Sequence, residues 1–276
     1  MSSHGQSASI QVSSLSTMKF IVSHDVDHLY LNEHWRDTFI PGLFRRSVRS
    51  IIDKELSLIE MAKRFSWQLH RINELHAFNE QNDIPATYFF GMRTGLNLSY
   101  HWQSAKKHVR FLQDSGVDIG LHGMAYDDLE RLGEEKKRME ELMDCSVDGI
   151  RNHYLRLADT TLPFMDKLEF KFDSTESGLE RPSKRGGLTE FPISLMDVHL
   201  AKIQPINLDS WMEKTWSRIH QAEKMQLPYF VVNFHDIYYS NGWPIYKAWY
   251  ERLIAELRDR DYKFVTFSVA LDELKP

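Results

Sequence analysis

The sequence predicts an α/β protein built on one parallel sheet or barrel. Apolar segments of strand length alternate along the chain with amphipathic segments of helix length, which is typical of parallel sheets. Hydrophobic residues make up 42% and aromatic residues 12% of the 276 residues, which is enough for a full core and excludes a disordered chain. Because no Pro- or Gly-rich linker divides the chain, we expect one domain over residues 18–276, after a flexible serine-rich tail over residues 1–17.

The predicted elements follow one another in a regular order. A first strand at 19–23 is followed by a long helical region at 41–82, in which apolar residues recur at three- and four-residue steps. We expect further strands at 86–90, 117–121, 149–151, 170–173, 188–193, 229–234 and 262–267, and further helices at 102–114, 129–143, 160–168, 209–225 and 244–259.

Charge and cysteine content exclude several classes of protein. The chain carries 34 basic and 39 acidic residues, so its net charge of −5 gives no overall attraction to nucleic acid or anionic lipid. The single cysteine, Cys145, excludes an internal disulfide and a cysteine-based zinc site. Residues 1–17 do not resemble a signal peptide, and no apolar run approaches the roughly 18 residues of a transmembrane helix. We therefore expect a cytoplasmic protein, in which the charged run 134–138 is a solvated helix face.

A group of histidines lies at the C-terminal ends of predicted strands. Of the thirteen histidines, five directly follow predicted strands, and several aspartates stand at the same places. Because the C-terminal ends of parallel strands meet at one face, these side chains are expected to converge on a divalent metal site with an acid or base beside it. The five histidines are His24, His28, His122, His153 and His235, and the aspartates are Asp25, Asp27, Asp127, Asp173 and Asp236.

Asp25 and Asp27 form the most informative pair. Alternate residues at the end of a strand project to the same side, so both carboxylates can face one cavity. Two carboxylates at close range repel each other unless a cation or a proton separates them. We prefer a functional interpretation to a solvated turn, because no turn needs both carboxylates.

The other strand ends supply complementary groups. Arg151 could anchor a carboxylate, and His153 and Tyr154 follow it closely. The most apolar strand ends at His235, and Tyr238 and Trp243 lie shortly after it in the sequence. Aromatic side chains beside a catalytic histidine suit a sugar-binding cleft, although simple packing would account equally well for Trp243.

In their order, these motifs resemble those of the NodB-homology polysaccharide deacetylases, carbohydrate esterases that act on N-acetylated sugars. The resemblance runs from about Lys19 to the C-terminus. It implies a distorted (β/α) barrel, usually of seven strands, with the long segment after the first strand forming a helical insertion. It also implies one divalent metal ion, for which we expect zinc, and a carbohydrate substrate.

The resemblance also implies roles for individual residues. Asp25 corresponds to the general base, Asp27 to a metal ligand and His235 to the general acid. Arg151 corresponds to the residue that orients the base, and Asp173 is its candidate partner. The backbone N–H of Tyr154 corresponds to an oxyanion donor.

One metal ligand of the family pattern is replaced. The family has His-x-x-x-His; His122 matches its first histidine, but Tyr126 occupies the place of the second. A site with one aspartate and two histidines needs another imidazole or its equivalent. We favour His153, with His28, Asp127 and Tyr126 as alternatives. If none of them serves, the protein is a metal-free relative without activity.

The segment 174–187 is glycine-rich and locally basic. Either it is a surface turn, or Arg185, with Arg181 and Lys184, contacts an anionic group of the substrate such as a uronate, phosphate or diphosphate. Since no export signal is visible, a nucleotide- or lipid-linked sugar precursor fits better than a mature polymer. The basic run 44–49 is expected to be a solvated helix face rather than a membrane surface or partner site.

Three functions follow. The first is a metal-dependent hydrolase that removes an acetyl or formyl group from an amino sugar of a cell-surface polysaccharide or its precursor. The second is a catalytically silent sugar-binding or assembly protein on the same barrel, and the third is a hydrolase of non-sugar C–N bonds. Tyr126 favours the silent protein, whereas the presence of Asp25, Arg151, Asp173 and His235 favours an enzyme.

Overall fold

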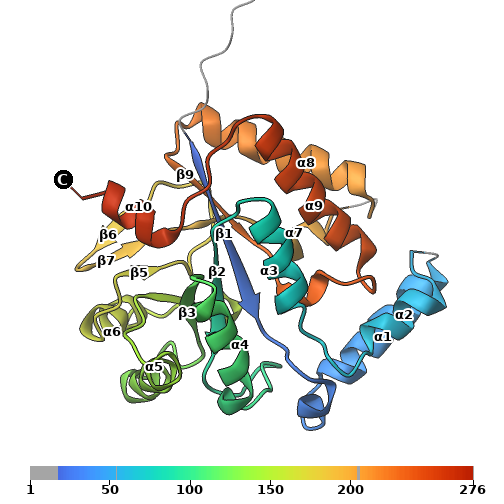
Figure 1. The fold of residues 1–276 in the computed structure, drawn as a ribbon, viewed down its shortest axis with the longest axis horizontal. Helices are drawn as coiled ribbons and strands as arrows, with labels where there is room; N and C mark the ends of the chain where they lie inside the picture. Colours follow the sequence, from blue (N-terminus) through green and yellow to red (C-terminus); the bar gives the residue numbers. More distant parts are fainter. Residues whose placement is uncertain (1–17, 54, 204–205, 276) are drawn as a thin grey trace, which may run out of the picture.

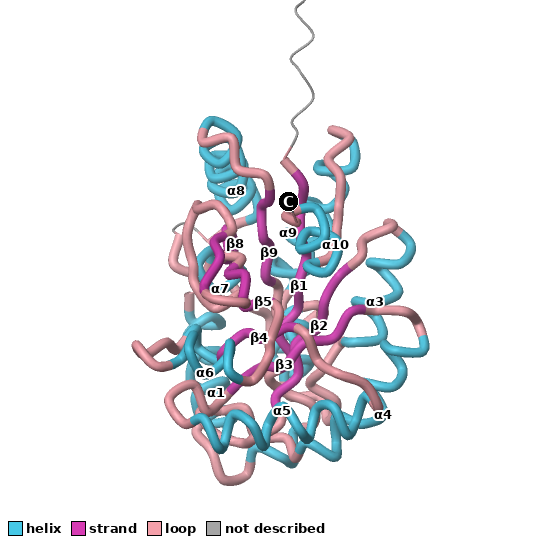
Figure 2. The backbone as a smooth tube through the Cα atoms, turned by 90° about the vertical axis from the view of Figure 1, so that its left-hand side faces the viewer, coloured by secondary structure: helices cyan, strands magenta, loops and turns pink. Residues whose placement is uncertain are grey.

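A curled sheet of nine strands organises the molecule. The structure is a computed structural model that describes residues 18–53, 55–203 and 206–275, so the predicted tail at 1–17 lies outside the described residues. The strand order is β6-β7-β5-β4-β3-β2-β1-β9-β8, and the strands form a half-barrel with the helices arranged around it (Figures 1 and 2). The strands are β1 (Lys19–Val26), β2 (Ala86–Gly91), β3 (Asp118–Gly123), β4 (Gly149–Asn152), β5 (Phe172–Asp173), β6 (Ser183–Arg185), β7 (Leu188–Glu190), β8 (Ile193–Met196) and β9 (Tyr229–Asn233).

The predicted α/β class and the helical insertion after the first strand are confirmed. The insertion comprises α1 and α2, and three helices, α4, α5 and α9, agree with their predicted bounds residue for residue. The helices are α1 (Phe39–Ile52), α2 (Leu58–Arg64), α3 (Ile72–Gln81), α4 (Trp102–Asp114), α5 (Leu129–Met143), α6 (Thr161–Lys167), α7 (Asp197–Leu200), α8 (Leu208–Lys224), α9 (Pro244–Asp259) and α10 (Phe267–Glu273).

The sheet has nine strands rather than the seven that the resemblance implies, and it differs from the eight strand segments of the sequence analysis at three places. The predicted strand 188–193 is two strands, β7 and β8, because Pro192 between them has no N–H to donate to a sheet. The segment 262–267 contributes only an isolated bridge between Phe20 and Phe264, since the Thr266 side chain caps α10 and turns the chain into a helix. The short β6 adds an antiparallel edge to the otherwise parallel sheet.

Strand alternation in β1 decides which side chains reach the inside of the half-barrel. Ile21 belongs to an inner apolar cluster with Phe89, whereas Phe20 and Val22 belong to the large cluster that includes the helices. Ser23, Asp25 and Asp27 continue the inner series, two residues apart. The backbone period therefore places both carboxylates on the inner side, at the C-terminal end of β1.

His24 has the opposite orientation, which corrects its expected place on the rim. Its Nδ1 lies 2.8 Å from the carbonyl oxygen of Phe234, and its Nε2 lies 2.9 Å from the amide nitrogen of Asn79 on α3. Burial lowers the pKa of His24 to about 3, against the opposing hydrogen bond to Phe234. His24 is thus a neutral packing residue between the sheet and its helices.

Glu135 corrects another expectation, because it is buried although the charged run 134–138 is predicted to be solvated. Its carboxylate accepts hydrogen bonds from the backbone N–H groups of Met124 and Ala125 at 2.8 and 3.0 Å. Burial raises the pKa of Glu135 to about 7, opposed by those two hydrogen bonds. Glu135 therefore ties α5 to the loop that follows His122.

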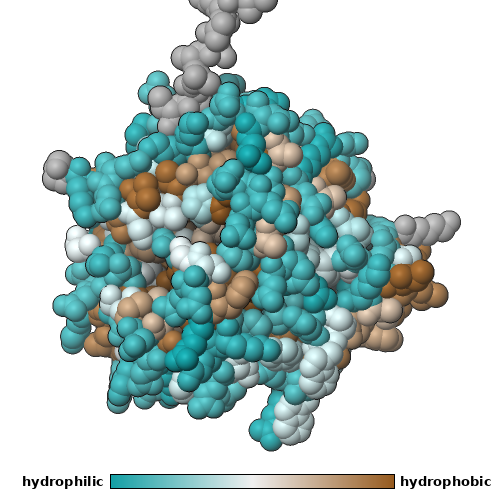
Figure 3. Space-filling view, in the orientation of Figure 1, coloured by the Kyte–Doolittle hydropathy of each residue, from teal (hydrophilic) through white to brown (hydrophobic). Residues whose placement is uncertain are grey.

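The insertion carries an exposed apolar surface. Apolar side chains gather at the outer end of α1 and α2, where Ile52, Leu58 and Ile59 are each at least 70% exposed (Figures 1 and 3). None of the described helices combines the length and hydropathy needed to cross a membrane.

Candidate active site

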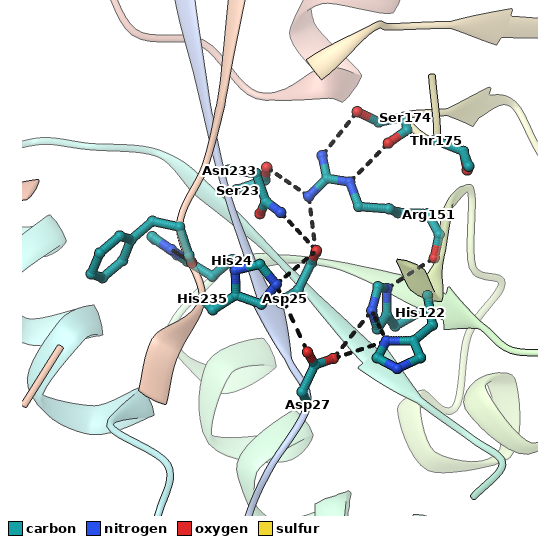
Figure 4. Close-up of polar contacts among 12 residues, drawn as sticks. Ser23, His24, Asp25, Asp27, His122, Arg151, Ser174, Thr175, Asn233 and His235 are labelled. Carbon is teal, nitrogen blue, oxygen red and sulfur yellow. Dashed lines mark hydrogen bonds and ion pairs between the residues drawn. The ribbon is translucent and has the colours of Figure 1, made fainter. Parts of the chain in front are cut away.

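Three strand ends bring one carboxylate and two imidazoles together. Asp27 follows β1, His122 lies on β3 and His153 follows β4. Asp27 Oδ1 lies 3.2 Å from His122 Nε2 and 3.3 Å from His153 Nδ1, and the two ring nitrogens are 3.1 Å apart. Figure 4 shows the Asp27 carboxylate directed at His122. Among the described residues these three form the group whose ligand atoms could hold a metal ion.

Backbone carbonyl groups fix which nitrogen of each imidazole is available. His122 Nδ1 lies 3.0 Å from the carbonyl oxygen of Arg151, and His153 Nε2 lies 2.9 Å from that of Leu96. A carbonyl oxygen can only accept, so these nitrogens carry the protons and the nitrogens facing Asp27 carry lone pairs when the rings are neutral.

These ligand atoms suit a cation. Asp27 Oδ1 is buried and accepts no hydrogen bond of good geometry, although both lone-pair nitrogens lie close to it. Burial disfavours the Asp27 anion, but His153 and His122 hold its pKa well below the usual range when their rings are protonated and metal is absent. Three converging lone pairs repel unless a positive charge lies between them, and an Asp-His-His set matches zinc. The residues present therefore fit the divalent metal that the resemblance implies.

The alternatives to His153 as third ligand do not belong to this converging group. Tyr126 packs its ring beneath the guanidinium of Arg156 at 4.0 Å, and Asp127 is exposed. His28 lines the same cavity, but its Nδ1 lies 3.2 Å from His34 Nε2 and its ring stacks on another aromatic side chain. The geometry thus favours the β4 histidine over the loop residues near His122.

Asp25 is held by the buried Arg151. The Nη1 atom of Arg151 lies 2.9 Å from Asp25 Oδ1, and Asn233 Nδ2 donates to Asp25 Oδ2 at 2.7 Å (Figure 4). Arg151 also donates to Ser23 Oγ at 2.9 Å and to the carbonyl and hydroxyl oxygens of Ser174 at 2.8 and 2.9 Å. Burial raises the pKa of Asp25, but Arg151 together with His122 and His235 lowers it by more, so the pKa lies below the usual value and the group is ionised.

His235, two residues after the end of β9, has a partner that the sequence analysis does not identify. Asp197, which follows β8, lies 2.9 Å from His235 Nδ1 and accepts the His235 backbone N–H at 2.6 Å. The His235 Nε2 atom lies 4.0 Å from Asp25 Oδ2 and 3.8 Å from Asp27 Oδ2. Burial lowers the pKa of His235, but Asp197 and then the other two carboxylates raise it to about 10. His235 is therefore protonated at neutral pH.

Asp173 does not occupy its expected place beside Arg151. Its Oδ1 atom accepts a hydrogen bond from Thr175 Oγ1 at 2.5 Å, and it faces Glu190 across β5 and β7. Burial raises the pKa of both carboxyl groups, and their mutual repulsion raises that of Glu190 further. The buried pair therefore keeps a proton that one carboxyl donates to the other.

Replacing Glu190 by glutamine is expected to flatten the pH dependence of stability. The folded protein keeps a proton that the unfolded chain releases above a pKa of about 4.3, so the free energy of unfolding falls as pH rises toward the raised folded pKa. The Glu190→Gln variant loses this fall and exceeds the wild type at pH 8 by about 1.4 kcal/mol per unit of pKa shift. Urea unfolding at pH 5 and pH 8 measures the difference in unfolding free energy between the variant and the wild type. The exposed Glu180→Gln is the control.

A cavity of about 740 Å³ opens over these groups. Asp25, Asp27, His122, His153 and His235 line it, together with Tyr154 and a wall of aromatic rings. Tyr154 has a positive φ of 56°, a conformation rare for a tyrosine. The aromatic wall consists of Tyr238, Trp243 and Tyr246.

Arg185 lies outside the cavity lining, which corrects its expected role as a substrate contact. It is exposed on β6, and its guanidinium lies 3.7 Å from Glu176. The arginines that do line the cavity, Arg46 and Arg64, belong to the helical insertion.

The fold was compared with known proteins. No family model and no curated protein matches the sequence. A solved structure of a Mycobacterium smegmatis protein assigned as a polysaccharide deacetylase matches with a TM-score of 0.66 and 17% identity, over 98% of this chain and 94% of that one. The chain has the polysaccharide deacetylase fold. The fold expected from the motif order is confirmed, although the identity is low.

The deacetylase fold carries more than one chemistry. The PuuE allantoinase matches with a TM-score of 0.63 and 14% identity, over 93% of this chain and 88% of that one. A Bacillus anthracis pseudoenzyme of carbohydrate esterase family 4 matches with a TM-score of 0.54 and 10% identity, over 94% and 67%. The fold alone therefore does not determine the activity of this chain, which depends on the residues of its own site.

Proposed function

We propose that the protein is a metal-dependent hydrolase that removes an N-acetyl or N-formyl group from an amino sugar of a cell-surface polysaccharide or its precursor. The observation that carries the proposal is the Asp27, His122 and His153 cluster, which lies beside an arginine-held carboxylate and an aspartate-held histidine in one cavity. The Arg151–Asp25 and Asp197–His235 pairs serve proton transfer, which a silent sugar-binding protein does not need.

Asp27, His122 and His153 would hold the metal, and zinc suits their one oxygen and two nitrogen atoms. When bound, a divalent ion supplies Lewis acidity, which polarises an amide carbonyl and makes a water molecule more acidic. The two backbone carbonyl groups that accept from the rings keep both imidazoles in the tautomer that such a site needs.

Asp25 is the proposed general base. Arg151 and Asn233 keep it ionised and orient its carboxylate toward the cavity, so it can take the proton of the attacking water. The water oxygen forms a bond to the acyl carbon, and the carbonyl oxygen becomes an oxyanion. The backbone N–H of Tyr154 is the proposed donor to this oxyanion.

His235 is the proposed general acid. An amide nitrogen cannot leave as an anion, so the C–N bond breaks as His235 Nε2 gives the nitrogen a proton. Asp197 accepts from Nδ1 and stabilises the positive imidazolium before this transfer. The products are a carboxylic acid and a free amine.

The aromatic wall favours a sugar over another amide. Tyr238, Trp243 and Tyr246 line the cavity with apolar ring surface and polar edges, which suit a pyranose ring, and Arg64 covers one face of Trp243. The likeness to an allantoinase keeps hydrolysis of a non-sugar C–N bond as the second candidate, since the same residues would perform it.

Metal content together with acyl release tests the proposal. We expect one divalent ion per chain in the purified protein, and release of acetate or formate from a panel of N-acylated amino sugars that also includes allantoin. The variants Asp27→Ala, His122→Ala and His153→Ala are each expected to lose the ion and the activity, because a single second-sphere change already costs about 10–100-fold in metal affinity.

The exposed His220→Ala is the matched control and should keep both properties. Failure to bind metal under any loading condition would contradict the proposal and leave the silent protein. Turnover of allantoin alone would favour the second candidate.

A further inference from the structure

An arginine of the insertion lies in the wall of the same cavity. Arg64, the last residue of α2, places its guanidinium 3.6 Å from the centre of the Trp243 ring. It donates from Nε to the carbonyl oxygen of Gly242 at 2.7 Å and from Nη1 to Ser47 Oγ at 3.3 Å. These contacts fix the position of the guanidinium, and no hydrogen bond or ion pair of the described residues uses its Nη2 atom.

Arg64 has no acidic partner. In the described part of the chain no carboxylate lies within ion-pair distance of Arg64 or of Arg46, the second arginine of this wall. Burial lowers the pKa of Arg64 to about 10, and the nearby charge of Arg46 adds to that effect. Glu60 acts on Arg64 only at longer range and caps α2 through Ser57, and Glu55, which lines the same cavity, is exposed and beyond ion-pair distance of either arginine. Two guanidinium groups on the wall of one cavity, one of them half-buried and neither paired with a carboxylate, form an environment that favours an anion.

Gly242 packs closely against Arg64 and lies in the loop that begins at His235. A Cβ atom at Gly242 would lie 2.9 Å from the backbone nitrogen of Arg64 and 3.1 Å from the carbonyl carbon of Lys63. The end of α2 therefore packs directly against the loop that begins at His235, and only glycine permits this close approach. Arg64 has a fixed position relative to the proposed general acid.

We propose that Arg64 and Arg46 form a specificity subsite for an oxyanion group, a carboxylate or a phosphate, of the amino-sugar substrate. The inference rests on the proposed function, and it moves the predicted anion contact from Arg185 to the insertion. A guanidinium offers paired N–H donors that match both groups, and a half-buried one forms stronger hydrogen bonds than a solvated one. The sugar ring would lie between this subsite and His235, against Tyr238.

Binding and turnover of three probes test the subsite. The probes are N-acetylglucosamine, its 6-phosphate and the corresponding N-acetylated uronic acid, used with the metal-loaded full chain. Calorimetry on proteins that also carry Asp25→Asn measures affinity without turnover. We expect Arg64→Gln to weaken binding of the two anionic probes by about 10–100-fold and of the neutral sugar by less than about 2-fold. In the active protein KM for the anionic probes should rise while kcat stays within about 2-fold.

Three further variants sharpen the test. Arg46→Gln, on the exposed face of α1, should show the same selectivity if Arg64→Gln does not fold, and Arg64→Lys should restore only part of the affinity because it lacks the paired donors. Arg185→Gln is the matched control, expected to leave all three affinities unchanged. The preferred anionic probe distinguishes a phosphate substrate from a carboxylate one.

Equal losses for neutral and anionic probes in Arg64→Gln, or no binding of any probe, overturn the subsite. Charge-selective binding without release of an acyl group from any probe would contradict the proposed function and leave the subsite standing. Deacetylation without charge preference, unaffected by Arg64→Gln, would contradict the subsite and leave the proposed function standing.

Discussion

Asp25→Asn is expected to lower kcat by about 10²–10⁴-fold while the protein keeps its full metal content. The amide keeps the shape of the side chain and can still accept from Arg151, but it cannot take a proton from water. Asp25 contributes no atom to the metal cluster, so the ion should remain. Initial rates of acyl release and metal analysis of the same preparation measure both effects.

Asp127→Asn is the matched control for this experiment. The same chemical change is made on an exposed loop residue near the site, and kcat should not change. Thermal unfolding of Asp25→Asn separates lost chemistry from lost structure, because the variant leaves the buried Arg151 without its anion. Loss of the metal in parallel with the rate would contradict the assignment of Asp25 as base.

Asp197→Asn is expected to lower kcat/KM and to move the alkaline limb of its pH profile to lower pH. Asp197 is the largest of the charges that raise the pKa of His235 to about 10. Without that charge the imidazolium loses its proton at a lower pH, and a neutral imidazole cannot protonate the leaving nitrogen. The loss at neutral pH should reach about 10²–10⁴-fold, as for removal of a general acid.

Asp197→Asn should also change how the free energy of unfolding depends on pH. Because the folded pKa of His235 lies above its usual 6.5, the stabilisation by Asp197 is fully present below pH 6.5 and disappears as pH rises through about 10. The difference in unfolding free energy between wild type and Asp197→Asn should therefore shrink over this range. The exposed Asp209→Asn serves as control, and an unchanged alkaline limb in Asp197→Asn would show that Asp197 does not govern His235.

The parallel core of the fold could be predicted from sequence because its signals are local. Apolar strand segments and amphipathic helices carry their own period, and helices such as α4 and α9 also have clear end signals. Asp25, Asp27, His122 and His235 could be placed for the same reason, since each stands at the end of such a strand. His153 needed one further argument, the missing histidine at position 126.

The parts that sequence analysis missed depend on which strands become neighbours. Asp197 directly follows β8, as Asp27 directly follows β1, but the sequence predicts one strand over 188–193 unless Pro192 is taken as a break. Glu190 meets Asp173 only through the register of β5 and β7, which no local pattern reveals. Arg64 reaches the cavity only because α2 packs against Gly242, a contact between residues 178 positions apart.

The origin of the three ligands on three different strands has a thermodynamic consequence. In the His-x-x-x-His pattern two ligands come from one short loop, whereas His122 and His153 are 31 residues apart and Asp27 comes from the other side of β2. An ion held by them would join β1, β3 and β4 as a cross-link that the unfolded chain cannot form. Ligation would then be linked to folding, and free metal at about 100 times its Kd would stabilise the native state by about 2.7 kcal/mol. Chelation would lower the melting temperature as well as the activity.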